Sequence, residues 1–142
     1  MYHFVRTCII AGALALASTS AFAGTAVIVS AQSATKTLSK DDVAALYLGK
    51  TTSLPGGGTA KLYDVSEGNP LREQFYQKVA GKSASQVKSV WSRLVFSGRA
   101  LPPKELANDA AVVKAVAADP TAVGYVDSSA VDGSVKVVLQ LP

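Results

Sequence analysis

The chain has 142 residues, a formal net charge of +4, and a single histidine, cysteine and methionine. These are His3, Cys8 and Met1, so the sequence after residue 23 contains no imidazole, thiol or thioether. Catalysis by histidine or cysteine and soft metal ligation are therefore excluded from the main body of the chain. We predict a protein that is not an enzyme and that holds no cofactor and no metal.

Residues 1–23 have the pattern of a signal peptide for export. Arg6 gives a positive start, residues 8–17 are apolar, and Ala21-Phe22-Ala23 is a small-x-small cleavage site. The alternative, a membrane anchor that is retained, needs a longer apolar run. We expect cleavage after Ala23 and a periplasmic location for the product.

Residues 24–142 are expected to form one domain. This segment has 13 lysines and arginines against 10 aspartates and glutamates, and 119 residues suffice for a core without disulfides. The basic residues are scattered along the sequence, with no aromatic ladder among them. This pattern argues against a nucleic-acid partner.

Apolar spacing and capping residues predict the elements in chain order. They are a strand at 25–30, a helix opened by Ser39 and stopped near Gly49, a strand at 59–65, a helix from Asn69-Pro70 to Ala80, a helix from Ser83 or Ser85 to Phe96, a helix capped by Asn108 or Asp109, and strands at 122–126 and 134–139. The order predicts an α/β sandwich in which a small mixed sheet is flanked by helices.

Two of these segments carry more specific expectations. The continuous apolar run at 25–30 indicates burial on both faces, as in a parallel sheet. In the helix that ends at Phe96, helical spacing places five apolar side chains on the buried side. They are Val87, Val90, Trp91, Leu94 and Val95.

Two short strings resemble catalytic motifs without the context these need. Gly49-Lys50-Thr51 lacks the first glycine and the preceding strand of a phosphate-binding loop. Ser85-x-x-Lys88 has the spacing of a serine–lysine acyl-transfer pair and would place the lysine beside the hydroxyl on a helix, but the companion strings are missing. We interpret Ser85 as a helix-start residue and Lys88 as a solvated side chain.

Three longer strings carry a family resemblance. They are LSKDDVAALYLGK at 38–50, VWSRLVFSGRALPP at 90–103 and DPTAVGYVD at 119–127. In this order and spacing they resemble the substrate-binding proteins of phosphate-type ABC transporters. The resemblance implies a periplasmic-binding-protein-like fold. Because family members are usually two-lobed clamps, it also implies that residues 24–142 form a single lobe.

The resemblance also implies a site for an oxyanion. In the family, a strand–helix junction that reads approximately Glu-Gly-Ser-Gly-Thr-Arg-x-x-Phe holds the anion, and residues 67–75 match it at Glu67, Gly68, Arg72 and Phe75. Asn69 replaces a serine, and Pro70 and Leu71 replace the glycine and the threonine. The candidate oxyanion contacts are Ser66, Gly68, Asn69 and Arg72.

An ordinary helix start also accounts for these residues. A helix N-terminus with a nearby arginine attracts an anion. However, Asn69 at the cap and Pro70 at the first helical position need no ligand, and Arg72 would then be a solvated side chain. Both interpretations stay open at the level of sequence.

The sequence therefore predicts an exported, non-catalytic protein that binds phosphate or a similar oxyanion weakly. The alternative is a periplasmic accessory or interaction protein that has lost the ligand and exposes an apolar surface where a second lobe would sit. A transporter or envelope protein is the expected macromolecular partner, and a homodimer that pairs two lobes is an intermediate hypothesis.

Overall fold

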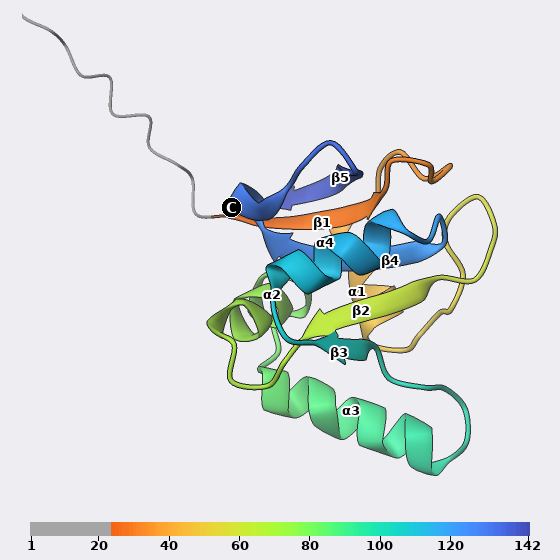
Figure 1. Ribbon diagram of the computed structural model, residues 1–142. Coiled ribbons are helices and arrows are strands. Elements are labelled where there is room, and N and C mark those ends of the chain that lie inside the picture. Colours follow the sequence, from red (N-terminus) through yellow and green to blue (C-terminus); the bar gives the residue numbers. More distant parts are fainter. Residues whose placement is uncertain (1–23) are drawn as a thin grey trace, which may run out of the picture.

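The computed structural model describes residues 24–142, and the predicted signal peptide lies outside the described residues. The elements are β1 (Thr25–Ser30), α1 (Lys40–Tyr47), β2 (Lys61–Val65), α2 (Pro70–Ala80), α3 (Ala84–Phe96), β3 (Lys104–Leu106), α4 (Asp109–Ala117), β4 (Ala122–Asp127), the 3-10 turn η1 (Ser128–Ala130) and β5 (Val135–Leu141). Figure 1 shows their arrangement.

The sheet has five strands in the order β3-β2-β4-β1-β5. β2 runs parallel to β3 and β4, whereas β1 runs antiparallel to both of its neighbours, β4 and β5. The predicted mixed sheet is therefore confirmed. The parallel environment expected for the first strand is wrong, although every residue of β1 is buried, because a central antiparallel strand that is covered on both faces shows the same apolar run.

Two neighbouring residues of β4, Gly124 and Tyr125, show which helices cover each face of the sheet. An added Cβ on Gly124 would lie 2.7 Å from Val112 of α4, whereas the ring of Tyr125 stacks on Phe75 of α2 at 3.7 Å. Since successive residues of a strand point to opposite faces, α4 covers one face of the sheet, and α2 covers the other together with α1 (Figure 1).

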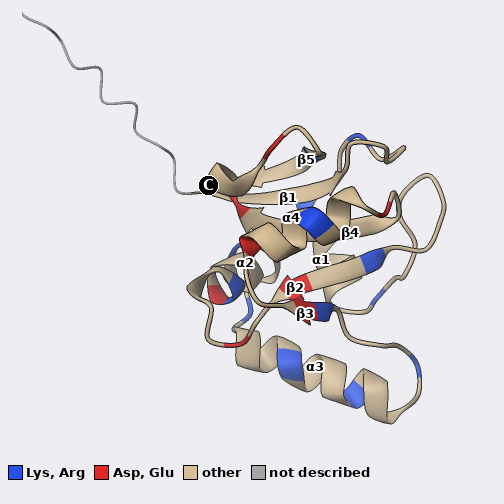
Figure 2. Ribbon diagram, in the orientation of Figure 1, with Lys and Arg blue, Asp and Glu red and all other residues tan. Residues whose placement is uncertain are grey.

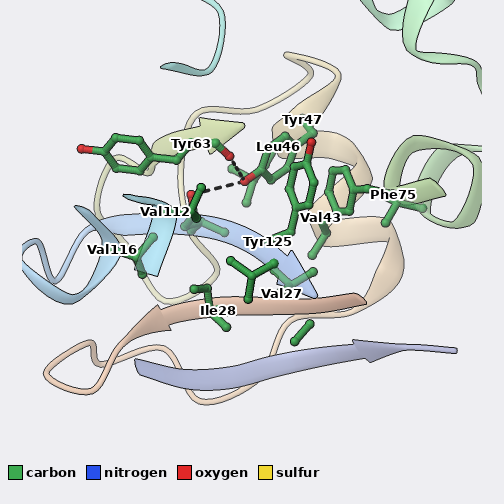
Figure 3. Close-up of a cluster of buried hydrophobic side chains, with 14 of the residues drawn as sticks. Val27, Ile28, Val43, Leu46, Tyr47, Tyr63, Phe75, Val112, Val116 and Tyr125 are labelled. Atoms are coloured by element: carbon green, nitrogen blue, oxygen red, sulfur yellow. Dashed lines mark hydrogen bonds between the residues drawn. The ribbon is translucent and has the colours of Figure 1, made fainter. Parts of the chain in front are cut away.

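The second layer has an aromatic core, shown in Figure 3. Tyr47 of α1 packs edge-on against Phe75 and Tyr125, with ring centroids 4.9 and 5.8 Å away. The single proton of its hydroxyl is shared between the main-chain oxygens of Tyr63, at 2.8 Å, and Val123, at 3.2 Å. One side chain thus fastens α1 to β4 and to β2, the strand that leads to the candidate site.

The predicted helix starts are confirmed by their caps. The side chains of Ser39, Asn69, Ser83 and Asn108 each accept a hydrogen bond from a main-chain N–H of the first helical turn. Such bonds satisfy donors that have no partner inside the helix. The starts of α2 and α3 are linked by a separate hydrogen bond, which the N–H of Ala84 donates to Glu73.

Two sequence expectations are corrected. Strand β3 was not predicted, because three residues show no alternation, and it gains its order from pairing with β2. In α3 only Val87 and Trp91 are buried, and Val95 is 44% exposed. Val90 and Leu94 are partly buried, and Leu94 packs against the core, so the apolar spacing is wider than the face that the helix buries.

None of the helices within residues 24–142 is long and apolar enough to cross a membrane.

Candidate functional site

The candidate site is built on the loop that joins β2 to α2. Gly68 has a φ of +86°, a left-handed conformation that favours glycine, and it turns the chain between strand and helix. Asn69 follows as the cap: its Oδ1 accepts from the N–H of Leu71 at 3.0 Å. Pro70, which has no N–H, occupies the first helical position. The cap and the proline predicted from sequence are both present.

Ser66 turns away from this helix start. Its main-chain N–H and its hydroxyl both donate to the carbonyl oxygen of Leu106, each at 3.0 Å. A serine hydroxyl has a single proton, so this one is committed to β3 and has none left for an anion. The structure thus brings Gly68, Asn69 and Arg72 together and leaves Ser66 beside them as a link to β3.

Arg72 points into the protein, and its side chain is only 9% exposed. Its Nη1 donates to Glu105 at 2.6 Å and to the carbonyl oxygen of Val65 at 3.3 Å. Its Nε lies 3.9 Å from Oδ2 of Asp64 and has no hydrogen-bond partner within residues 24–142. The alternative of a solvated arginine is therefore wrong, and one buried N–H of the guanidinium remains free.

The guanidinium keeps its positive charge in this position. Burial alone would lower the pKa of Arg72, but the hydrogen bond to Glu105 and the charge of Asp64 raise it above its ordinary value. Arg72 is thus a permanent cation with a free donor, held by the ends of β2 and β3.

Asp64 is the buried carboxylate next to Arg72. The hydroxyls of Tyr76, at 2.5 Å, and Tyr125 donate to its two oxygens. Burial raises the pKa of Asp64, and the hydrogen bonds from Tyr125 and Tyr76 and the charge of Arg72 oppose this rise. Burial and the charge of Asp64 likewise raise the pKa values of Tyr76 and Tyr125, so both phenols stay protonated donors. Sequence analysis did not single out this network, because its members lie on three separate elements.

A cavity of about 320 Å³ opens between the starts of α2 and α3. It is lined by Glu67, Gly68, Asn69, Pro70, Arg72, Glu73, Ala84, Ser85 and Lys88. Three of the four predicted contacts thus line one cavity, and Ser66 does not. The positive ends of two helix dipoles flank the same space, which favours negative charge.

Helix α3 contributes residues that sequence analysis interpreted otherwise. Ser85 and Lys88 were interpreted as a helix-start residue and a solvated lysine, yet both line the cavity opposite Asn69 and Arg72. Their three-residue spacing places them on one side of the helix. That spacing was the available signal, but nothing in the sequence told which surface the helix would face.

Carboxylates of the protein itself bind several of the cationic and N–H donors at this site. Glu67 pairs with Lys88 at 2.7 Å, and the hydrogen bond and charge of Lys88 lower the pKa of Glu67. Glu73 accepts from the N–H of Ala84 at 2.9 Å, at the start of α3. Together with the pair between Arg72 and Glu105, these contacts place three carboxylates against the donors of the site.

A second cavity, of about 570 Å³, adjoins the first and shares Glu67, Arg72 and Lys88 with it. Its remaining wall is largely apolar and runs between α3 and the segment before β3. That wall contains Trp91, Val95, Phe96, Pro102 and Pro103. The single tryptophan of the chain therefore lies beside the candidate site.

Within residues 24–142, no three aspartate, glutamate, histidine or cysteine side chains are grouped so that they could hold a metal ion. The arrangement instead offers charged and neutral hydrogen-bond donors around a small cavity. Such a set suits an anion with several oxygen acceptors.

No protein-family model and no curated protein matches this sequence. Solved structures do match. A phosphate ABC transporter substrate-binding protein from Clostridium perfringens with bound phosphate has a TM-score of 0.67 and 23% identity over 81% of this chain and 44% of its own. An ABC-type phosphate transport receptor from Vibrio cholerae gives 0.64 and 17%, over 81% and 45%. A possible phosphate binding protein from Planctomyces limnophilus gives 0.60 and 12%, over 81% and 40%.

The resemblance predicted from the three sequence strings is thereby confirmed as a resemblance of fold. The chain has the architecture of one part of these phosphate-type binding proteins and spans less than half of their length. The expected mixed α/β sandwich with flanking helices is confirmed with it. The oxyanion contacts themselves stay a prediction, because identities of this order concern the fold alone.

Proposed function

We propose that residues 24–142 bind a small oxyanion such as phosphate, without catalysing a reaction, in the cavity between the starts of α2 and α3. The observation that carries this proposal is the meeting of two helix N-termini with Arg72 and Lys88 around one space. The bound phosphate named for the Clostridium perfringens protein supports the choice of anion.

The proposed contacts come from both helices. Gly68 would supply its main-chain N–H, Asn69 its side-chain NH2 and Arg72 its guanidinium. Ser85 and Lys88 would add a hydroxyl and an ammonium group from α3. Ser66, the fourth contact expected from sequence, would support the loop through β3 instead.

We expect weak binding, with a dissociation constant in the roughly millimolar range. An incoming anion has to displace the carboxylates of Glu67 and Glu105 from their partners, and this exchange offsets much of the new attraction. The open cavity also leaves the ligand partly hydrated.

Calorimetric titration of residues 24–142 with phosphate and with sulfate at low salt tests the proposal. Fluorescence of Trp91, which lies in the adjoining cavity, gives a second signal. Lys88→Gln and Ser85→Ala are expected to weaken phosphate binding severalfold, whereas Lys114→Gln, an exposed control on α4, is expected to leave it unchanged. Equal binding by all three variants, or no heat at millimolar phosphate, would refute the site.

Arg72 needs a variant that keeps its charge, because a buried arginine also supports the fold. Arg72→Lys retains the cation but loses the planar set of donors, so we expect weaker phosphate binding in a folded protein. A melting curve recorded on the same sample separates loss of the site from loss of structure.

The proposal includes export of the protein to the periplasm. Cleavage after Ala23 and a periplasmic location would place this binding outside the cytoplasm, where the neighbours' names suggest a transport partner. Mass spectrometry of the protein from the envelope fraction is expected to find Gly24 at the N-terminus. A mass that includes residues 1–23 would contradict the cleavage.

The Ser66 hydroxyl donates to Leu106, and Glu105 accepts from Arg72, so both Ser66 and Arg72 have partners within the protein. These contacts favour the alternative, an accessory protein that has lost its ligand. This alternative predicts capture of an envelope or transporter protein that is independent of phosphate. A homodimer of two lobes is a third arrangement, which light scattering of the purified protein distinguishes from a monomer.

A further inference from the structure

The last turn of α3 and the loop after it form a protrusion with unusual surface chemistry. We call residues 93–104, which run from the last turn of α3 to the first residue of β3, the α3 tip. Its Phe96 and Leu101 are 96% and 85% exposed, and Val95 is also exposed. Within residues 24–142, these are three of the four large apolar residues that are exposed. Figure 1 shows the end of α3 at the lower edge of the molecule, from where the chain returns to β3.

The same segment is positively charged. Arg93, Arg99 and Lys104 are its charged residues, and none of them forms an ion pair in the part of the chain that the structure describes. The nearest acidic residue in sequence, Glu105, is engaged by Arg72. Figure 2 shows that α3 carries basic residues and no acidic ones.

This charge is a local property and does not reflect the whole chain. Residues 74–104 contain six lysines and arginines and no aspartate or glutamate, whereas the rest of residues 24–142 contains seven basic and ten acidic residues. Charge asymmetry of this kind indicates a negatively charged partner.

A second copy of the chain does not suit the α3 tip. A symmetric dimer would bring the same patch of both subunits together and place these basic residues against one another. A nucleic acid would use the ring of Phe96 for stacking but would leave the aliphatic Leu101 and Val95 exposed. An acidic protein would need a preformed apolar pocket for each of the exposed side chains as well as its negative charge.

An anionic lipid surface satisfies all of these features. Acyl chains accept aromatic and aliphatic side chains without a preformed pocket, and lipid phosphates attract arginine and lysine beside them. In α3, Arg93 and Phe96 are three residues apart and so lie next to each other on the helix. Basic and apolar groups can therefore reach headgroups and acyl chains at the same time.

We propose that the α3 tip docks the protein onto membrane surfaces that contain anionic phospholipid. Phe96, Leu101 and Val95 enter the boundary between headgroups and acyl chains, and Arg93, Arg99 and Lys104 contact the lipid phosphates. The contact is peripheral and reversible, since the apolar group is small. This proposal is independent of the oxyanion cavity.

Co-sedimentation of residues 24–142 with vesicles tests the proposal. We expect binding at low salt to vesicles of phosphatidylcholine that contain phosphatidylglycerol, loss of this binding at high salt, and little binding to phosphatidylcholine alone. The Arg93→Glu/Arg99→Glu variant is expected to bind at least tenfold more weakly, since each basic residue contributes about fivefold. Phe96→Ser/Leu101→Ser is also expected to lose binding while its net charge is unchanged.

The matched control is Lys36→Glu/Lys114→Glu, which changes the net charge equally at exposed positions outside the α3 tip, in the segment before α1 and on α4. It is expected to bind anionic vesicles nearly as well as the wild type. Equal weakening by the control would assign the binding to overall charge and refute a dedicated surface, as would wild-type binding by the Phe96→Ser/Leu101→Ser variant.

A third measurement separates the lipid surface from the oxyanion cavity. Millimolar inorganic phosphate, compared with chloride at equal ionic strength, is expected not to release the protein from the vesicles. Specific release by phosphate would overturn the proposal, since the vesicle contact would then run through the cavity. Failure to bind anionic vesicles at low salt would overturn it too, and capture of an acidic protein by the α3 tip would then identify the other class of partner.

Discussion

Nη1 of Arg72 lies 2.6 Å from Oε1 of Glu105, so the main cation of the candidate oxyanion site already holds a carboxylate. Glu105 reaches Arg72 from β3, a three-residue strand at the edge of the sheet. Of the two carboxylates near Arg72, Asp64 is buried and further bound by two tyrosines, whereas Glu105 is exposed. Glu105 is therefore the group that an external anion would displace.

Replacing Glu105 tests this exchange. We expect Glu105→Gln to raise the affinity of residues 24–142 for phosphate about two- to fivefold, since a partly exposed ion pair contributes up to about 1 kcal/mol. Calorimetry with phosphate measures the change. Asp41→Asn, which removes an exposed carboxylate from α1, is the control for net charge. An equal gain in both variants would show that Glu105 does not compete with the anion.

The buried Asp64 predicts a dependence of stability on pH. Burial raises its pKa, so the folded protein holds this proton more tightly than the unfolded chain does. The contribution of Asp64 to the free energy of unfolding is therefore greatest below the ordinary value of about 3.9 and falls as the pH rises through the raised pKa. Wild type should lose stability relative to Asp64→Asn over this range, which denaturant titrations at several pH values measure.

Asp132→Asn gives a control of opposite sign. The hydrogen bonds from Ser134 lower the pKa of Asp132, so wild type should gain stability relative to this variant as the pH rises through the acid range. A nuclear magnetic resonance titration of the Asp64 carboxyl carbon checks the shift without a mutation. A midpoint at or below the ordinary value would contradict the prediction.

The sequence predicts the helix starts of this fold well, because each start depends on a local signal. Ser39, Asn69, Ser83 and Asn108 are capping residues, and each caps the expected helix. Strand β3 and the antiparallel pairing of β1 depend instead on contacts between segments distant in sequence. Local patterns carry no signal for such pairings.

The candidate site shows the same division. The junction at residues 67–72 is continuous in sequence, and its helix start is predicted from the asparagine and the proline. The inward direction of Arg72 follows from its contacts with Asp64, Val65 and Glu105, the last of which lies 33 residues away. The position of Lys88 follows from the packing of α3 against α2. These contacts became visible only with the fold.

Gly124 allows α4 to approach the sheet closely. A Cβ at this position would lie 2.7 Å from Val112 and 2.9 Å from Val116, closer than packed atoms tolerate. We expect Gly124→Ala to lower the free energy of unfolding by about 1–3 kcal/mol, which urea titration measures. Gly133→Ala is the matched control, because no atom lies within 4 Å of its added Cβ, and it should be nearly neutral. Similar losses in both variants would mean that the close contact with α4 is not the cause.

The hydroxyl of Tyr47 holds α1 against β2 and β4, and its removal tests how much this contact stabilises the fold. It donates to the main-chain oxygens of Tyr63 and Val123, in β2 and β4, and burial raises its pKa well above the ordinary value, so it stays a donor. Tyr47→Phe keeps the ring packing seen in Figure 3 but leaves both oxygens without this donor. We expect a loss of about 1–2 kcal/mol in the free energy of unfolding.

Tyr63→Phe is the control for this loss. The hydroxyl of Tyr63 makes no hydrogen bond within residues 24–142 and points away from the cluster in Figure 3, so its removal should cost much less. Because Asp64 and Val65 follow directly on β2, hydrogen exchange at their amides should quicken in Tyr47→Phe and not in Tyr63→Phe. Unchanged exchange in both variants would mean that the Tyr47 hydroxyl does not hold β2 in place beneath the candidate site.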